Sequence, residues 1–362
     1  MHDGYAHSET DPRAKRASDT ALIKHVWRLA GVSSDIKPGQ LKRVLIAGEP
    51  VVIGRTKTGE DFALRDVCPH RAAPLSQGRI VETTTTRAVE VECPYHGWRF
   101  GVEDGRCTAA PALSERAGID TTKIATPRYH IHHANGLLWV CLDEPGAPPP
   151  DIGLHTDRRP DLVTIVDANG PYDEAVIGLI DPAHTPYVHK QWWWRDGKAA
   201  EEKTKTFEPT PLGFRMPPHK PSSNSRIYAM IGGAPTTEIE FRLPGLRIET
   251  IRNQKHTFVG VTVITPIEKG RNRITHLIYW DLPILTLMKP VLARMSRSFL
   301  AQDGAILDAQ ATNLARFEHT PLYLGDPDTP ARWYYQLKRA WNRADIGAFI
   351  NPLKEDTLHW KT

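Results

Sequence analysis

Hydrophobic residues in the first part of the chain occur in short runs that are separated by turn residues. The segment LKRVLIAGEPVVIGRTKTGEDFALRDV, residues 41–67, predicts three strands joined by a Gly-Glu-Pro turn and a Thr-Gly turn. A further strand is predicted from GLLWVCLDEPG, residues 136–146. Short strands between Gly- and Pro-containing turns are typical of all-β domains, so we expect one at residues 21–145.

The second part of the chain predicts strands first and helices afterwards. EPGAPPPD, residues 144–151, is Pro-rich and predicts a linker. Beyond the strands, residues 290–317 predict a long helix and residues 329–345 a C-terminal helix. We therefore expect an α+β fold overall, with a second domain at residues 146–362. The segments that predict consecutive strands of an antiparallel sheet are residues 226–233, 236–251, 256–267 and 273–284.

Composition and charge exclude several classes of protein. The hydrophobic fraction of 40% and the charged fraction of 24% are typical of soluble globular proteins. No apolar run is long enough to predict a membrane span. The net charge of +4 comes without a cluster of Lys and Arg, so no nucleic-acid interface is expected. Residues 1–20 are polar and lack the apolar core of a secretory signal, which predicts a disordered tail and a cytoplasmic protein.

Two segments of the first domain, CPHRAAPL and CPYHGWRF, each pair a cysteine with a histidine. The pairs are Cys68 with His70 and Cys93 with His96. Two thiols and two imidazoles on two loops predict a four-ligand metal site. A structural zinc ion and a [2Fe–2S] cluster can use the same four donors, so the spacing alone leaves both open.

These two segments resemble the Rieske signature, in which paired loops hold a [2Fe–2S] cluster. The resemblance implies that Cys68 and Cys93 bind one iron and that His70 and His96 bind the other. The gap between the pairs is longer than is usual in that family, and the extra residues lie around VETTTTRAVEVE, residues 81–92, which predicts a lengthened hairpin. Neutral imidazole in place of thiolate raises the reduction potential above that of an all-cysteine ferredoxin.

A second histidine pair lies in the segment DPAHTPYVH, with Asp181, His184 and His189. On a straight helix two residues five apart point about 140° away from each other, so His184 and His189 could not readily bind one ion. Pro186 has no backbone N–H, and its ring would clash with the carbonyl four residues earlier in a regular helix. We therefore expect the helix to bend or stop at Pro186, which can bring His189 toward His184. The alternative is that His184 is an ordinary core histidine close to a helix start.

A third ligand could come from the predicted long helix, which contains Asp303 and Asp308. Helical periodicity places Asp303 within a stripe of apolar residues and Asp308 on nearly the opposite side. A carboxylate within a buried stripe is costly unless it is paired or bound to a metal. Asp303 is therefore the predicted metal ligand and Asp308 a solvated residue. The apolar stripe is predicted to contain Phe299, Leu300, Ile306, Leu307 and Leu314.

With both motifs in this order, the chain resembles the Rieske non-haem iron oxygenases, also called aromatic-ring-hydroxylating oxygenases. The resemblance implies a helix-grip (START-like) catalytic domain in which His184, His189 and Asp303 bind mononuclear Fe(II). It implies that Asp181 is a catalytic residue, placed between the two metal centres, where it bridges to a cluster histidine of a neighbouring subunit in a head-to-tail homotrimer. The family takes electrons from NAD(P)H through a ferredoxin and a reductase and uses them to activate O₂.

The length of the chain is similar to that of the shorter homotrimeric members, such as the vanillate and dicamba O-demethylases and the N-demethylases. We therefore expect a terminal oxygenase that oxidises a hydrophobic aromatic molecule by N- or O-dealkylation. The alternatives are ring hydroxylation or C-hydroxylation, or an electron carrier without oxygenase activity. Trp192, Trp193 and Trp194 are predicted to pack in the core or a subunit interface, or to line the substrate pocket. Three arginines near the cluster loops fit docking of an acidic ferredoxin, namely Arg71, Arg79 and Arg99.

Overall fold

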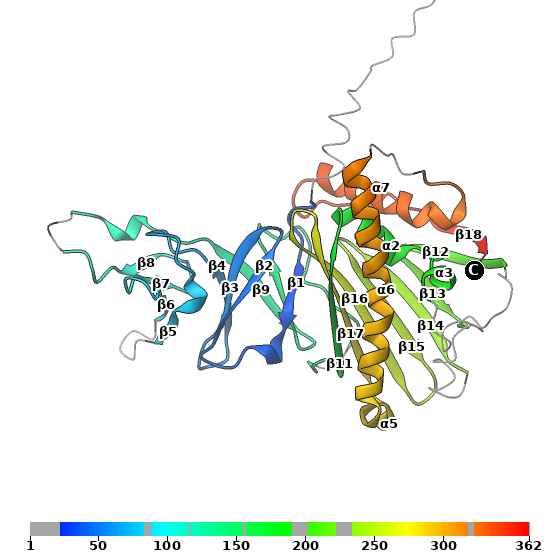
Figure 1. The fold of residues 1–362 in the computed structure, drawn as a ribbon, viewed down its shortest axis with the longest axis horizontal. Coiled ribbons are helices and arrows are strands. Elements are labelled where there is room, and N and C mark those ends of the chain that lie inside the picture. Colours follow the sequence, from blue (N-terminus) through cyan, green and yellow to red (C-terminus); the bar gives the residue numbers. More distant parts are fainter. Residues whose placement is uncertain are drawn as a thin grey trace, which may run out of the picture.

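The computed structural model describes residues 22–82, 88–114, 116, 118–154, 157–189, 202–221, 234–317 and 322–361. Three predictions lie outside these residues: the tail at residues 1–20, the strand at residues 226–233 and the packing of Trp192–Trp194. No helix in the described part of the chain is long and apolar enough to span a membrane. Figure 1 shows two β-rich parts side by side, with the helices gathered on the C-terminal part.

The N-terminal part consists of two antiparallel sheets. A six-stranded sheet has the order β1-β10-β9-β4-β3-β2, and a four-stranded sheet has the order β5-β6-β7-β8. The smaller sheet lies at the far end from the C-terminal part (Figure 1). The strands are β1 (Arg28–Val32), β2 (Leu41–Ile46), β3 (Glu49–Arg55), β4 (Asp61–Arg65), β5 (Arg79–Glu82), β6 (Val89–Glu92), β7 (Arg99–Gly101), β8 (Cys107–Ala109), β9 (Arg128–Ala134) and β10 (Leu137–Cys141).

Two hairpins of this part test the predicted turns. The turn between β2 and β3 is formed by Ala47 and Gly48, which both have positive φ (54° and 84°), so the predicted Gly-Glu-Pro turn is wrong. Two successive residues of positive φ match the right-handed twist of the flanking strands, and Glu49 and Pro50 pair as strand residues. The predicted hairpin is present, since β5 pairs with β6 antiparallel, and its loop at residues 83–87 lies outside the described residues.

The C-terminal part is built on one antiparallel sheet of eight strands in the order β11-β17-β16-β15-β14-β13-β12-β18. The predicted strands at residues 236–251, 256–267 and 273–284 correspond to β14 to β17. Four strands at residues 162–169, 202–210, 213–219 and 356–361 were not predicted. The bounds are β11 (Leu162–Asn169), β12 (Glu202–Thr210), β13 (Gly213–His219), β14 (Thr236–Arg242), β15 (Leu246–Arg252), β16 (Thr257–Glu268), β17 (Arg271–Trp280) and β18 (Asp356–Lys361).

Helices cover one face of this sheet. Both predicted helices form, since α6 runs for 28 residues and α7 follows it. Figure 1 shows α6 crossing in front of the strands while α2 and α7 lie at one end of them. The helices are α2 (Tyr172–Ile180), α3 (Thr185–Val188), α5 (Pro283–Leu287), α6 (Lys289–Arg316) and α7 (Thr329–Arg343). The short 3-10 helices are η1 (Ser33–Asp35), η2 (Leu75–Gln77), η4 (Thr121–Lys123) and η5 (Asp326–Asp328).

The two faces of the eight-stranded sheet bury different partners. Alternate residues of a strand point to opposite faces, so each strand contributes to two cores. On the helical face, Ile264 and Ile274 pack with Leu300 of α6 and Tyr334 of α7. On the other face, buried residues of β15, β16 and β17 pack with Trp27, Leu29 and Trp139 of the N-terminal part. This arrangement confirms the α+β fold, with a β-rich N-terminal domain and an antiparallel sheet with helices after it.

Candidate metal centres

The first candidate centre lies on two loops, one of which joins the two central strands of the four-stranded sheet. One loop follows β4 and carries Cys68 and His70, and the other joins β6 to β7 and carries Cys93 and His96. Each loop is a tight turn closed by backbone hydrogen bonds. Cys68 N donates to Ala73 O at 2.9 Å, and Cys93 N donates to Trp98 O at 2.7 Å. A residue with positive φ shapes each turn: Ala72 (57°) in the first and Gly97 (70°) in the second.

The structure brings the four predicted donors together in two pairs. The rings of His70 and His96 lie 4.6 Å apart between centroids. Cys68 and Cys93 are buried, with exposed fractions of 2% and 3%. Burial raises the pKa of the Cys68 thiol to about 11, and the neighbouring Cys93 thiol adds to this against the backbone N–H of His70. A buried thiol with a raised pKa, such as that of Cys68, becomes a thiolate near neutral pH when a cation is bound close to it.

One observation tests whether this site fits a [2Fe–2S] cluster. The Nδ1 atoms of His70 and His96 are buried and have no hydrogen-bond partner among the described residues, as expected of atoms that ligate a metal. Two imidazole nitrogens and two buried thiols on facing loops are a donor set that fits a [2Fe–2S] cluster with two Cys and two His ligands.

Trp98, which the sequence analysis did not single out, packs against this set. Its ring stacks on that of His70 with 4.7 Å between centroids and 10° between planes. Its side chain is 5% exposed, and its buried Nε1 has no hydrogen-bond partner among the described residues. A buried indole N–H ordinarily finds an acceptor, so its position beside the four donors suits an acceptor such as sulfur.

The second candidate centre joins three predicted residues, His184, His189 and Asp303. Among the described residues, their ligand atoms form a group that lies within 4.8 Å of one another. The Oδ1 atom of Asp303 lies 3.8 Å from His184 Nε2 and 3.4 Å from His189 Nε2. Two imidazoles and one carboxylate on one side of a common point are the donors of a facial triad, which suits non-haem Fe(II).

The local backbone produces this convergence differently from the prediction. The first helix, α2, ends at Ile180, and Asp181 is extended (φ −65°, ψ 121°), so the break lies before Pro186 and not at it. Pro186 lies in the first turn of α3, where a missing N–H costs nothing. His184 caps α3 at its start and His189 at its end, and the extended backbone of His189 (ψ 101°) turns its ring toward His184.

The third residue of the group comes from α6, as the helical periodicity predicted. The side chain of Asp303 is 27% exposed, and burial raises its pKa to about 6 against the attraction of His184 and Arg247. Asp308 is exposed and accepts hydrogen bonds from Asn169. The predicted stripe is wrong at Ile306, which is 48% exposed, because the buried side of α6 follows Leu300, Gly304 and Leu307.

Two residues of α6 fix the ring of His189. Phe299 stacks on it with 3.5 Å between centroids, and Gln302 Oε1 lies 3.3 Å from its Nδ1. His189 is 1% exposed, and burial together with repulsion from His184 lowers its pKa to about 4. Its ring is therefore neutral near pH 7, which is the form that binds metals. Gln302 was not predicted, although its position directly before Asp303 in the sequence was a usable signal.

Asp181, predicted as a catalytic residue, lies next to His184. The Nδ1 atom of His184 donates to the backbone carbonyl of Asp181 at 3.0 Å, and the Asp181 carboxylate lies 3.6 Å from the same nitrogen. Burial alone would lower the pKa of His184, but hydrogen bonding and attraction from Asp181 raise it above its ordinary value. A proton held on Nδ1 leaves Nε2 free to face Asp303 and His189. The Asp181 side chain is 34% exposed.

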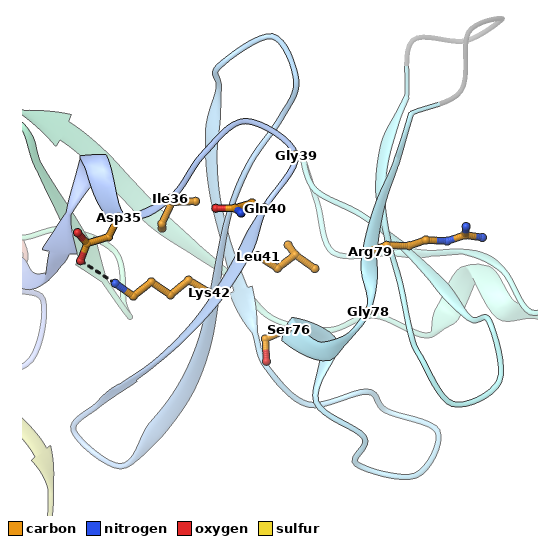
Figure 2. A pocket seen from close by; sticks show the side chains of 9 residues that line it. All are labelled: Asp35, Ile36, Gly39, Gln40, Leu41, Lys42, Ser76, Gly78 and Arg79. Atoms are coloured by element: carbon orange, nitrogen blue, oxygen red, sulfur yellow. Dashed lines mark hydrogen bonds and ion pairs between the residues drawn. The ribbon is translucent and has the colours of Figure 1, made fainter.

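A cavity of about 390 Å³ lies in the N-terminal part, and none of His184, His189 and Asp303 lines it (Figure 2). It is framed by the segment from Asp35 to Lys42 and by Ser76, Gly78 and Arg79. Its charged side chains are already paired: Lys42 with Asp35 at 2.9 Å, and Arg79 with Glu92 at 2.7 Å. Both cations that line the cavity therefore already have a carboxylate partner.

Comparison with known proteins identifies the N-terminal part. The family described as "Rieske [2Fe-2S] domain" matches residues 26–128. Pheophorbide a oxygenase of Oryza sativa is 31% identical over 224 residues, which are 58% of this chain and 39% of that protein. The oxygenase component of dicamba O-demethylase from Stenotrophomonas maltophilia is 30% identical over 47% of this chain and 48% of that one. The chain thus spans less than half of the length of these curated relatives.

A solved structure extends the comparison to most of the chain. The crystal structure of dicamba monooxygenase bound to dicamba superimposes with a TM-score of 0.67 at 19% identity, over 88% of this chain and 98% of that one. At this identity the likeness shows the fold. Together with the domain match, it confirms the predicted Rieske domain and the predicted resemblance to Rieske oxygenases.

Proposed function

We propose that this chain, which carries a Rieske [2Fe–2S] domain and the fold of the Rieske oxygenases, is the terminal oxygenase component of a multicomponent monooxygenase. The supporting observation is the convergence of His184, His189 and Asp303 within 4.8 Å, in the same chain as the Rieske domain. A protein that only carried electrons would need no second donor set of this kind. We also propose a division into a Rieske domain at residues 21–145 and a catalytic domain at residues 146–362.

The residues of each centre have distinct roles in this proposal. Cys68, His70, Cys93 and His96 would hold the cluster, and His184, His189 and Asp303 would hold Fe(II). When bound, the iron would supply open coordination positions for the activation of O₂, with two electrons from NAD(P)H delivered through a reductase and a ferredoxin. Gln302 and Phe299 hold the ring of His189 in place, and the Asp181 carbonyl holds that of His184. Fixed ligand orientation of this kind favours a single metal geometry.

Asp181 would also connect subunits. Its carboxylate is one-third exposed and lies within 3.6 Å of His184, so a neighbouring chain can reach it without displacing the iron ligand. We propose a head-to-tail homotrimer in which Asp181 bridges to a cluster histidine of the neighbouring subunit. Electrons would then pass from one chain's cluster to the next chain's iron site.

The proposed reaction is N- or O-dealkylation of a hydrophobic aromatic molecule. In the O-methyl case, O₂, two electrons and two protons convert the methyl ether to a hydroxyl compound, formaldehyde and water. The name of the relative dicamba O-demethylase supports this choice over ring hydroxylation, which remains the second candidate within the class.

The test is reconstitution of the purified, iron-loaded chain with a ferredoxin, its reductase and NADH. A panel of N-alkyl, O-methyl and unsubstituted aromatics is screened for aldehyde release and hydroxylated products. We expect aldehyde from wild type and from Asp308→Asn, which serves as the matched control, and none from Asp303→Asn. A hydroxylated ring without aldehyde would support the second candidate, and full activity of Asp303→Asn would contradict the proposed iron site.

A further inference from the structure

A row of polar side chains crosses the helical face of the eight-stranded sheet. In the strand register Thr164 lies beside His276, His276 beside Thr262, and Thr262 beside Arg247. Residues in register on neighbouring antiparallel strands point to the same face of a sheet. The Thr164 hydroxyl lies 2.7 Å from that of Ser296 on α6, so the face that carries this row is the one that α6 covers.

The same side of α6 carries the proposed iron ligand. Asp303 follows Ser296 by seven residues, or about two helical turns, and therefore lies on the same side of the helix. Next to Asp303, Gly304 packs so closely on the sheet that a Cβ there would lie 3.1 Å from Val166 of β11. The polar row and the iron ligands thus face the same interior region from opposite sides.

Two members of the row retain hydrogen-bonding capacity. Arg247 pairs with Glu249 at 3.1 Å, and one carboxylate can engage at most part of a guanidinium that has five N–H donors. The Nδ1 atom of His276 lies 2.8 Å from the hydroxyl of Thr262. This contact occupies one ring nitrogen and leaves Nε2 for another partner, with no such partner among the described residues.

The charges of this group limit which ligand it can bind. Glu249 balances Arg247, and its side chain is 17% exposed. Burial, with repulsion from Arg247, lowers the pKa of His276 to about 4, so this ring is neutral near pH 7. A carboxylate ligand beside Arg247 would therefore also lie beside Glu249, and the repulsion between the two carboxylates would offset the attraction of the guanidinium. A neutral oxygen acceptor gains the same N–H donors without that repulsion.

We propose that Arg247 and His276 recognise the carbonyl oxygen of an uncharged aromatic substrate and hold its alkyl group toward His184, His189 and Asp303. This inference rests on the proposed oxygenase function and adds the chemical class of the substrate. Because Arg247 keeps unused donors in a partly buried site, an analogue that lacks the oxygen leaves them unpaired, which is an effective basis for selectivity.

The test measures binding, without turnover, of three aromatics of similar size to the full, metal-loaded chain. The probes are 4-methoxyacetophenone, its isostere 4-isopropenylanisole, in which a methylene group replaces the oxygen, and the anion 4-methoxybenzoate. We expect the ketone to bind at least about tenfold more tightly than either of the others, by calorimetry or ligand-observed NMR. Arg247→Met should reduce ketone binding to the level of the isostere and leave binding of the isostere unchanged.

Two further variants keep the test interpretable. Arg247→Lys keeps the charge opposite Glu249 but lacks the planar fork, so it should fold and bind the ketone less tightly than wild type. Arg273→Met removes a guanidinium that pairs with Asp167 on the other face of the sheet and should leave all three affinities unchanged. Tighter binding of the benzoate, an undiminished ketone preference in both Arg247 variants, or no binding of any probe would overturn the inference. A ketone preference without aldehyde release in the reconstituted system would contradict the proposed function alone.

Discussion

Replacement of Lys338 by methionine removes the cation from a buried ion pair that joins α7 to α2. Lys338 Nζ donates to both carboxylate oxygens of Asp173 at 2.8 and 2.7 Å. Tyr334 donates its hydroxyl to the same carboxylate at 2.6 Å. The side chains of Lys338 and Asp173 are 2% and 9% exposed, so solvent screens the pair only weakly. The contact matters for the site because α2 ends directly before Asp181.

We expect Lys338→Met to lower the free energy of unfolding by about 3–5 kcal/mol, because it leaves a buried carboxylate without its counter-charge. The double variant Asp173→Leu/Lys338→Met removes both charges, so it should recover most of that loss. As a matched control, Lys42→Met breaks the exposed pair with Asp35, whose side chains are 39% and 52% exposed, and should cost less than about 1 kcal/mol.

The assay is urea unfolding of the metal-loaded chain, followed by far-UV circular dichroism and tryptophan fluorescence. Stability is compared through the unfolding midpoint, with the denaturant slope checked for each variant. A Lys338→Met variant that lost no more stability than Lys42→Met would refute the reasoning. The reasoning would also be refuted if Asp173→Leu/Lys338→Met were less stable than Lys338→Met.

Three further predictions follow from the described contacts. Trp98→Phe should lower the midpoint potential of the Rieske cluster, because it removes the N–H that we expect to stabilise the reduced, more negative cluster. The potential is measured by redox titration, and an unchanged value would show that this N–H does not contact the cluster. Gly78→Ala should reduce the cluster content of the purified protein, because a Cβ at this position would lie 1.9 Å from the carbonyl oxygen of Glu92. Cluster content is measured by iron and sulfide analysis, with Gly178→Ala as the control, since nothing lies within 4 Å of a Cβ there. Folding lowers the pKa of His276 from 6.5 to about 4, so the unfolded chain binds the extra proton and stability falls as the pH drops from about 6.5 toward 4. Between urea titrations at pH 7 and pH 4.5, His276→Gln should therefore lose less stability than wild type. An equal loss in both proteins would contradict this.

Local patterns were sufficient to predict some of the elements that carry the donors. The strands from β2 to β4 and from β14 to β17 were predicted from short apolar runs between turn residues, and the helices α6 and α7 from helical patterns and start signals. The strands β11, β12, β13 and β18 were missed. In β12, lysine and threonine alternate over KTKT, a pattern with no apolar face that does not distinguish a strand from a loop. Its pairing with β18 depends on a partner far away in the sequence.

At the candidate iron site, too, some features were predicted from local patterns and others were not. Helical periodicity favoured Asp303 over Asp308, and Asp303 is the one that lies beside the two histidines. The expected bend at Pro186 was wrong, because the extended Asp181 ends α2 before a helix could reach this proline. The roles of Gln302, Trp98 and Arg247 depend on which side chains lie opposite them, and no local pattern contains that information.

The sequence by itself determined the chemistry that is available: which residues can donate to a metal, and which segments become strands or helices, since both depend on side-chain type and short-range spacing. Tertiary structure decided the rest. The backbone dihedrals of His189, the packing of α6 on the sheet and the strand register determine which donors meet and which charges face them. These are long-range properties, because each depends on contacts between segments that only the folded chain brings together.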